Sequence, residues 1–276
     1  MKKEDIDKYI EKYVTELKLL DYSERTISSY LFFLRPFLET IDNPEKVNID
    51  KVKLYSASLI DKYSNKSRAL AISSLRFFFK NIVERPDIFV KLKVPKKEEY
   101  LPSILTLEEI KLLVNTAKTT KSKLIIKLLY SAGLRVSEVV NLKVKDLDFN
   151  ESSGWVRQGK GKKDRLFKIA ENLSKEIKIF TEEKCDEEYV FSTDKPLSTR
   201  NIQDLIRRIS KKAGISKKVT PHTLRHSFAT HLLEDGENLV MIQQLLGHKN
   251  IETTKIYTHI SQEQIKKVKS PGDKLY

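Results

Sequence analysis

The break in helical periodicity between Glu84 and Ser103 is the feature that most limits how this chain can fold. Three prolines lie in this stretch, and charged residues replace the apolar pattern found on either side. Because proline cannot continue a helix, such a stretch is typical of a linker. The chain is also longer than one domain of roughly 150 residues needs. We therefore predict two domains, at residues 1–84 and 104–276, joined by a linker at 85–103.

Residues 1–84 predict a domain of four helices. Apolar residues recur there at helical spacing in four runs, with polar residues between them. The helices are expected near 6–17, 24–41, 49–63 and 66–83. The polar face of the last run includes Lys66, Arg68 and Arg76, which either lie along DNA or form an ordinary solvated face.

Residues 104–276 predict a domain that mixes helices with a small antiparallel sheet. The sequence Thr106-Leu107-Glu108-Glu109 matches a capping box, which begins a helix. From Gly154 to Ile169 the pattern changes to two short strands around a glycine- and lysine-rich turn at 159–164, as in a β-hairpin. Further helices are expected at 124–129 and near Asn172, Thr199 and Pro221.

A surplus of positive charge characterises both predicted domains. The formal net charge is +14, of which residues 1–97 carry +6 and the remainder +8. A surplus on both sides of the linker indicates a polyanion that touches both domains, and nucleic acid fits best. A generally lysine-rich surface is the alternative.

The single cysteine and the first residues indicate a soluble, cytoplasmic protein. Cys185 excludes an intramolecular disulfide and lacks the basic neighbours that make a thiol reactive, which agrees with a reducing compartment. The chain starts with charged residues rather than an apolar signal segment, and no run of about 18 apolar residues occurs.

The segment Thr220-Pro221-His222-Thr223-Leu224-Arg225-His226 has a pattern that suits anion chemistry. Threonine is a good N-cap, and proline suits the first helical position. His222 and Arg225, at i and i+3, then face the same way at the positive end of a helix, which suits a phosphate. His226 lies within reach of the same face, so spacing alone does not choose between it and Arg225.

A zinc site is the alternative for these histidines, since His222 and His226 are four residues apart and His231 follows. The sequence argues against zinc because it has no HExxH glutamate and no cysteine pair to complete a site. For His226 and His231 we prefer a packed or capping imidazole.

Five short motifs, in their order along the chain, resemble those of the tyrosine site-specific recombinases. The motifs are Gly133-Leu134-Arg135, Gly159-Lys160-Gly161, His222-Thr223-Leu224-Arg225-His226, Leu245-Leu246-Gly247-His248 and Ile256-Tyr257-Thr258-His259. The resemblance covers nearly the whole chain and is greatest to the Xer recombinases, which resolve chromosome dimers. It implies a mainly helical fold, with a SAM-like, DNA-clamping core-binding domain followed by an α+β catalytic domain.

The resemblance also implies six catalytic residues: Arg135, Lys160, His222, Arg225, His248 and Tyr257. The two arginines would grip the scissile phosphate, and the tyrosine would attack it and become joined to the DNA 3′ phosphate. His222 would assist proton transfer, His248 would hydrogen-bond a phosphate oxygen, and the lysine would protonate the departing 5′ oxygen. Lys162 and Lys163 are expected DNA contacts, and either replaces Lys160 if the hairpin register differs.

The implied activity is strand exchange through a Holliday junction, with no ATP, metal or other cofactor. Four protomers would act on two inverted-repeat DNA sites of dif type, and the free protein would be a monomer or dimer. A DNA translocase is a further candidate partner. A phage or mobile-element integrase, or a non-catalytic DNA-binding protein of this fold, are the alternatives. Residues 261–269, with Pro271-Gly272, resemble the short helix that family members lend to a neighbouring protomer; a solvated end is the other interpretation.

Overall fold

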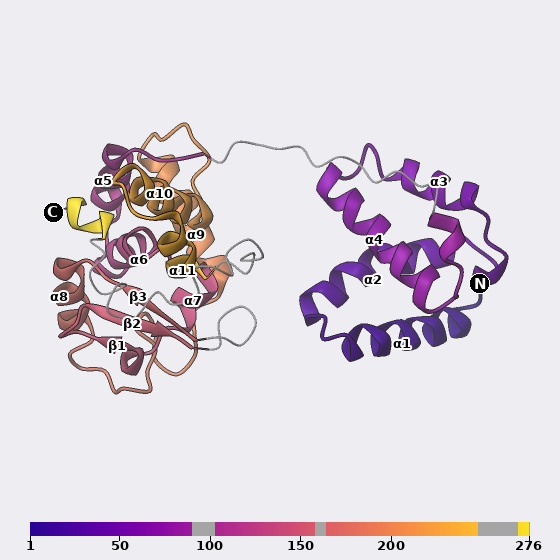
Figure 1. Ribbon diagram of the computed structural model, residues 1–276, viewed down its shortest axis with the longest axis horizontal. Coiled ribbons are helices and arrows are strands. Elements are labelled where there is room, and N and C mark those ends of the chain that lie inside the picture. The colour runs from indigo at the N-terminus through magenta and orange to yellow at the C-terminus, as the bar shows by residue number, and fades with distance from the viewer. Residues whose placement is uncertain (90–102, 158–163, 248–269, 276) are drawn as a thin grey trace. The chain divides into compact units, whose positions relative to one another are not determined.

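The computed structural model describes residues 1–89, 103–157, 164–247 and 270–275. The chain divides into two compact units, Met1–Tyr100 and Leu101–Tyr276, and each has its own hydrophobic core. Helices dominate both units, and the second also holds a small antiparallel sheet (Figure 1). The expected fold class is therefore confirmed. No helix within the described ranges is both long and apolar enough to cross a membrane.

Four helices form the first unit, as the periodicity predicts. They are α1 (Lys3–Leu19), α2 (Glu24–Glu39), α3 (Ile49–Ser58) and α4 (Asn65–Asn81), with 3-10 helices at Pro44–Lys46 and Pro86–Phe89. Helix α3 ends before the expected position near residue 63, because the chain turns there and Ser64 begins α4 as its N-cap. Ser23 and Asn48 likewise cap α2 and α3 by accepting a backbone N–H of the first turn.

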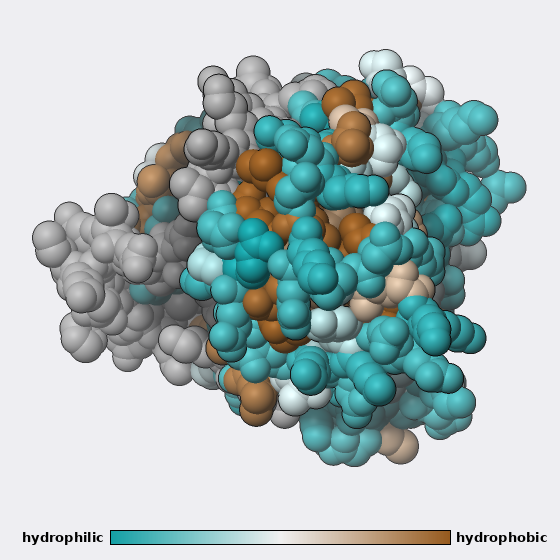
Figure 2. All heavy atoms as spheres, turned by 90° about the vertical axis from the view of Figure 1, so that its right-hand side faces the viewer, coloured by the Kyte–Doolittle hydropathy of each residue, from teal (hydrophilic) through white to brown (hydrophobic). Residues whose placement is uncertain are grey.

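Buried hydrogen bonds tie three helices together in the core of the first unit. The Tyr13 hydroxyl lies 2.9 Å from Ser74 Oγ, which in turn donates to the backbone carbonyl of Tyr30. Ile88 is buried against the same core, so this unit extends past the predicted domain end into the stretch expected to be linker. The face of the unit that Figure 2 shows is covered mainly by hydrophilic side chains.

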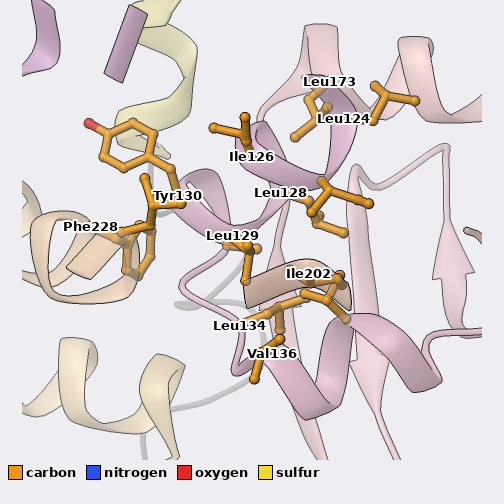
Figure 3. Close-up of a cluster of buried hydrophobic side chains, with 14 of the residues drawn as sticks. Leu124, Ile126, Leu128, Leu129, Tyr130, Leu134, Val136, Leu173, Ile202 and Phe228 are labelled. Carbon is orange, nitrogen blue, oxygen red and sulfur yellow. The ribbon is translucent and has the colours of Figure 1, made fainter. Parts of the chain in front are cut away.

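Helix α6 lies at the centre of the second unit. This unit contains α5 (Leu107–Thr116), α6 (Thr120–Ser131), α7 (Val136–Asn141), α8 (Glu171–Phe180), α9 (Thr199–Lys212), α10 (Pro221–Glu234) and α11 (Leu239–Leu246), with 3-10 helices at Val144–Asp146 and Pro271–Leu275. Thr106 begins α5 with the predicted capping box. Figure 3 shows Leu128 and Tyr130 of α6 in one buried cluster with Leu173 of α8 and Phe228 of α10. Each fully buried leucine of this kind stabilises the fold by about 1.5–3 kcal/mol.

The sheet contains the predicted hairpin and one further strand. Strands β1 (Leu147–Asp148), β2 (Ser153–Val156) and β3 (Arg165–Lys168) are antiparallel in that order. Val156 pairs with Arg165, and Gly154 lies opposite Phe167, where a Cβ would come within 2.5 Å of the ring. Strand β1 was not predicted, because two residues are too few to show alternation. The turn at 158–163 lies outside the described residues.

The last described residues pack on the second unit. Ser270 Oγ donates to the backbone carbonyl of Ser131 at 2.5 Å, and a Cβ at Gly272 would lie 2.2 Å from the Ser131 Cβ. Ser270 and Gly272 are buried. A solvated end is therefore wrong for these residues, because they fit closely against α6. Residues 261–269 lie outside the described ranges.

Candidate active site

Three arginines from separate parts of the second unit converge on the carboxylate of Glu138. Arg135 Nη1 lies 2.7 Å from Glu138 Oε1. Arg165 Nη2 and Arg225 Nη1 lie 2.5 and 3.9 Å from Oε2. The side chain of Glu138 is 6% exposed, and those of the three arginines are between 7% and 20% exposed. We call these four residues the arginine cluster.

A tight turn after α6 positions Arg135. Gly133 has a φ of +58°, which favours glycine, and a Cβ there would lie 2.5 Å from the Phe228 ring. Arg135 follows as the N-cap of α7, and its backbone N–H donates to the Glu138 carboxylate at 2.7 Å. Gly133 thus ends α6, and Arg135 is directed into the cluster.

The start of α10 positions Arg225 and His222. Thr220 is the N-cap and Pro221 the first helical residue, as predicted. Arg225 is buried, whereas His226 is exposed. The structure therefore makes the choice that spacing could not, because Arg225 is the residue turned into the unit. His222 is exposed near the beginning of the helix.

The two arginines of the predicted set also bind the carboxyl end of α11. Arg225 donates to the backbone carbonyls of Gly133, at 2.5 Å, and Leu246. Arg135 Nη2 donates to the carbonyl of Gly247 at 2.8 Å, and this glycine ends α11 with a φ of +61°. These contacts bring the turn after α6, the start of α10 and the end of α11 to one place.

The arginine cluster has an excess of positive charge in a largely buried position. Burial and the neighbouring Arg135 lower the pKa of Arg225 to about 9, although Glu138 opposes the shift, so Arg225 stays protonated at neutral pH. Burial also lowers the pKa of Arg165. One carboxylate cannot balance three guanidiniums, and uncompensated buried charge is unfavourable. The cluster is therefore suited to an oxyanion such as a phosphate, which guanidinium groups hydrogen-bond well.

Several predicted residues lie outside the described ranges, so their positions are not given. They are the catalytic candidates Lys160, His248 and Tyr257 and the DNA-contact candidates Lys162 and Lys163.

The sequence did not identify Arg165 or Glu138 as site residues. Arg165 is in a short strand, where an arginine is normally expected on the solvated face, and its partner lies 27 residues away in the sequence. Glu138 lies in none of the five motifs that carry the family resemblance. The available signal was the capping position of Glu138, three residues after Arg135.

Basic side chains are exposed on α4 and α9. On α4, Lys66 and Arg76 are exposed, while Arg68 is partly buried and donates to Asn65 Oδ1 at 3.0 Å. Helix α9 buries isoleucines on one side and exposes a basic face that the sequence analysis did not single out. That face consists of Arg200, Arg207, Arg208, Lys211 and Lys212.

Three histidines, His222, His226 and His231, lie in the part of the chain that the structure describes. Within the described ranges, no group of three or more His, Cys, Asp or Glu side chains could hold a metal ion. His231 Nδ1 lies 2.8 Å from the Tyr130 hydroxyl, so this imidazole is packed as expected. His226 is exposed instead of packed.

Comparisons with known proteins identify the family of this chain. A model described as the phage integrase family matches residues 103–264, and one for the phage integrase N-terminal SAM-like domain matches residues 9–87. Tyrosine recombinase XerA of Thermococcus kodakarensis is 42% identical, over 94% of this chain and 93% of the relative. The crystal structure of a XerA recombinase is 34% identical, with a TM-score of 0.51 over 94% of this chain and 96% of that one. A lambda integrase tetramer bound to a Holliday junction shares the fold, with 19% identity and a TM-score of 0.74 over 92% of this chain and 80% of that one.

Proposed function

Because this chain belongs to the phage integrase family and is a tyrosine recombinase of the Xer type, we propose that it exchanges DNA strands at specific sites through a covalent 3′-phosphotyrosyl intermediate. The observation that supports this most is the arginine cluster. Arg135 and Arg225, which the family resemblance assigns to the scissile phosphate, lie on the same buried carboxylate with surplus positive charge. A DNA phosphate supplies the missing negative charge.

The proposed reaction is a transesterification at phosphorus. The Tyr257 oxygen forms a bond to the phosphorus while the bond to the 5′ oxygen breaks. His222 assists removal of the phenolic proton, and Lys160 delivers a proton to the departing 5′ oxygen. Because the phosphotyrosine keeps the energy of the broken phosphodiester, a 5′ hydroxyl of the partner strand can reverse the step without ATP.

Stabilisation of the transition state is assigned to Arg135, Arg225 and His248. Negative charge builds on the non-bridging oxygens as the tyrosine attacks, and fixed donors in a water-poor site stabilise it strongly. Two guanidiniums suit this role because neither loses its proton at neutral pH. His248 would add a hydrogen bond to one of these oxygens.

Both units are proposed to contact the DNA. In the first unit, the exposed Lys66 and Arg76 of α4 would bind phosphates, as expected of a core-binding domain that clamps the duplex. In the second unit, the basic face of α9 would do the same. Four protomers would assemble on two inverted-repeat sites of dif type and resolve chromosome dimers in the cytoplasm through a Holliday junction. Residues 261–269 would be exchanged between protomers in that assembly.

A trapping experiment tests the proposal. A duplex site is first selected from a random inverted-repeat library by its binding to the protein. A nick placed beside the cleavage point then lets the short fragment that carries the freed 5′ hydroxyl diffuse away, which traps the intermediate. A protein–DNA adduct that survives denaturation should form, and Tyr257→Phe should abolish it without loss of binding. Tyr189→Phe, which removes a hydroxyl from the second unit, is the matched control and should form the adduct normally. An adduct with Tyr257→Phe would exclude this nucleophile.

A further inference from the structure

Arg165 is a buried arginine whose guanidinium is only partly hydrogen-bonded. Its Nη2 donates to Glu138 Oε2 at 2.5 Å, while Nε and Nη1 are buried and have no hydrogen-bond partner among the described residues. A buried donor without a partner is unfavourable, because it has given up its hydrogen bonds to water. The side chain also fits under the end of α11, because a Cβ at Gly247 would lie 2.9 Å from its Cδ and Nε. The fold therefore holds this charge in place despite its unfavourable surroundings.

Arg165 hydrogen-bonds the oxygen of the Glu138 carboxylate that lies nearest to Arg225. Glu138 Oε1 accepts from Arg135, and Oε2 accepts from the Arg135 backbone N–H and from Arg165. Arg225 is left 3.9 Å from Oε2. Because one carboxylate is shared in this way, its single charge cannot balance all three guanidiniums, and the cluster keeps its surplus.

We propose that Arg165 is a positioning residue for strand cleavage, which acts through Glu138 to hold the carboxylate against Arg135 and to preserve positive charge for the phosphate. Its Nε and Nη1 are too buried to contact DNA where they lie. Arg165 is also the first residue of β3 and pairs with Val156 at the turn end of the strand pair, so the same contact anchors that end of the hairpin. This role rests on the proposed recombinase function and adds a residue to it.

The first test separates binding from cleavage. Arg165→Met keeps most of the apolar stem but removes the charge, and Arg157→Met removes a charge from an exposed arginine of the same hairpin. With saturating nicked duplex, Arg165→Met should form the adduct about 10²-fold more slowly, with DNA affinity and thermal melting close to those of the parent protein. Arg157→Met should cleave at the parent rate. Cleavage by Arg165→Met within about threefold of the parent rate would overturn the proposal.

Two further measurements identify the route by which Arg165 acts. In a Glu138→Gln background, adding Arg165→Met should slow cleavage by less than about threefold, because the carboxylate through which Arg165 acts is already gone. If the two substitutions had fully additive effects on the cleavage rate, the proposal would be contradicted. A substrate with sulfur in place of the bridging 5′ oxygen needs no proton donor. If it restored cleavage by Arg165→Met, the residue would act on the hairpin lysine and the proposed route through Glu138 would be wrong.

An anion-binding measurement does not depend on recombination. Inorganic phosphate, titrated into each protein and followed by calorimetry, should bind about tenfold more weakly to Arg165→Met than to the parent, since one nearby positive charge is lost. Arg157→Met should bind phosphate as the parent does. If the parent formed no adduct but this difference appeared, the recombinase proposal would fail while the role of Arg165 in the cluster would stand. Equal phosphate affinity in Arg165→Met and the parent would overturn that role.

Discussion

Arg135 Nη2 donates a hydrogen bond to the backbone carbonyl of Gly247, with 2.8 Å between the two atoms. The contact joins the turn that follows α6 to the residue that ends α11, 112 positions further along the chain. Arg225 binds the preceding carbonyl, that of Leu246. The groups proposed to bind phosphate therefore also hold the point from which the chain continues toward His248 and Tyr257.

Gly133→Ala should lower the free energy of unfolding by about 2 kcal/mol and slow cleavage, because the Cβ would require both a strained φ and movement of Phe228. Urea unfolding measures the first effect and the trapping assay the second. Gly214→Ala is the control, since it has a φ of +70° but no neighbour within 4 Å of the added Cβ. It should lose only about 1 kcal/mol, the cost of the backbone conformation. Equal losses would show that the Phe228 contact is unimportant.

Glu138→Ala should destabilise the second unit by about 3–5 kcal/mol, since it leaves three buried guanidiniums without their shared carboxylate. Chemical unfolding gives the measurement. Glu176→Ala is the control, since it breaks an ion pair with Lys127 whose carboxylate side chain is 39% exposed. It should lower the free energy of unfolding by no more than about 1 kcal/mol. A loss at Glu138 no larger than that at Glu176 would mean that the arginines do not depend on this carboxylate.

The features that could be predicted from the sequence have local signals. The four helices of the first unit, the capping box at Thr106 and the hairpin each depend on residues close together in the chain. The two arginines proposed to bind phosphate were predicted from motif resemblance, and the cluster that surrounds them depends on folding. Arg225 donates to the backbone carbonyl of Gly133, although 92 positions separate the two residues in the sequence. Helical spacing could not show that Arg225 rather than His226 is buried. Periodicity describes one element at a time and does not show which buried charges meet.

Gly272→Val should release the carboxy-terminal residues from the second unit, because its Cβ would lie 2.2 Å from that of Ser131. Loss of this fit would also weaken the ion pair between Lys274 and Asp235. Hydrogen exchange of a peptide covering 270–275 should become faster than in the parent protein. Gly214→Val, in open space, should leave exchange in that peptide unchanged. Unchanged exchange in Gly272→Val would mean that the tail accommodates the clash without leaving.

Replacing Arg207 and Lys211 of α9 by alanine should weaken DNA binding and flatten its salt dependence. Each phosphate contact releases a condensed counterion, so losing both should reduce the slope of log affinity against log salt by about 2. Lys175→Ala with Lys178→Ala removes the same charge from exposed positions on α8 and is the control. Fluorescence anisotropy with a labelled duplex across a salt series gives both slopes. If the two double variants had the same slope, the effect would come from net charge alone, and α9 would have no specific place at the DNA.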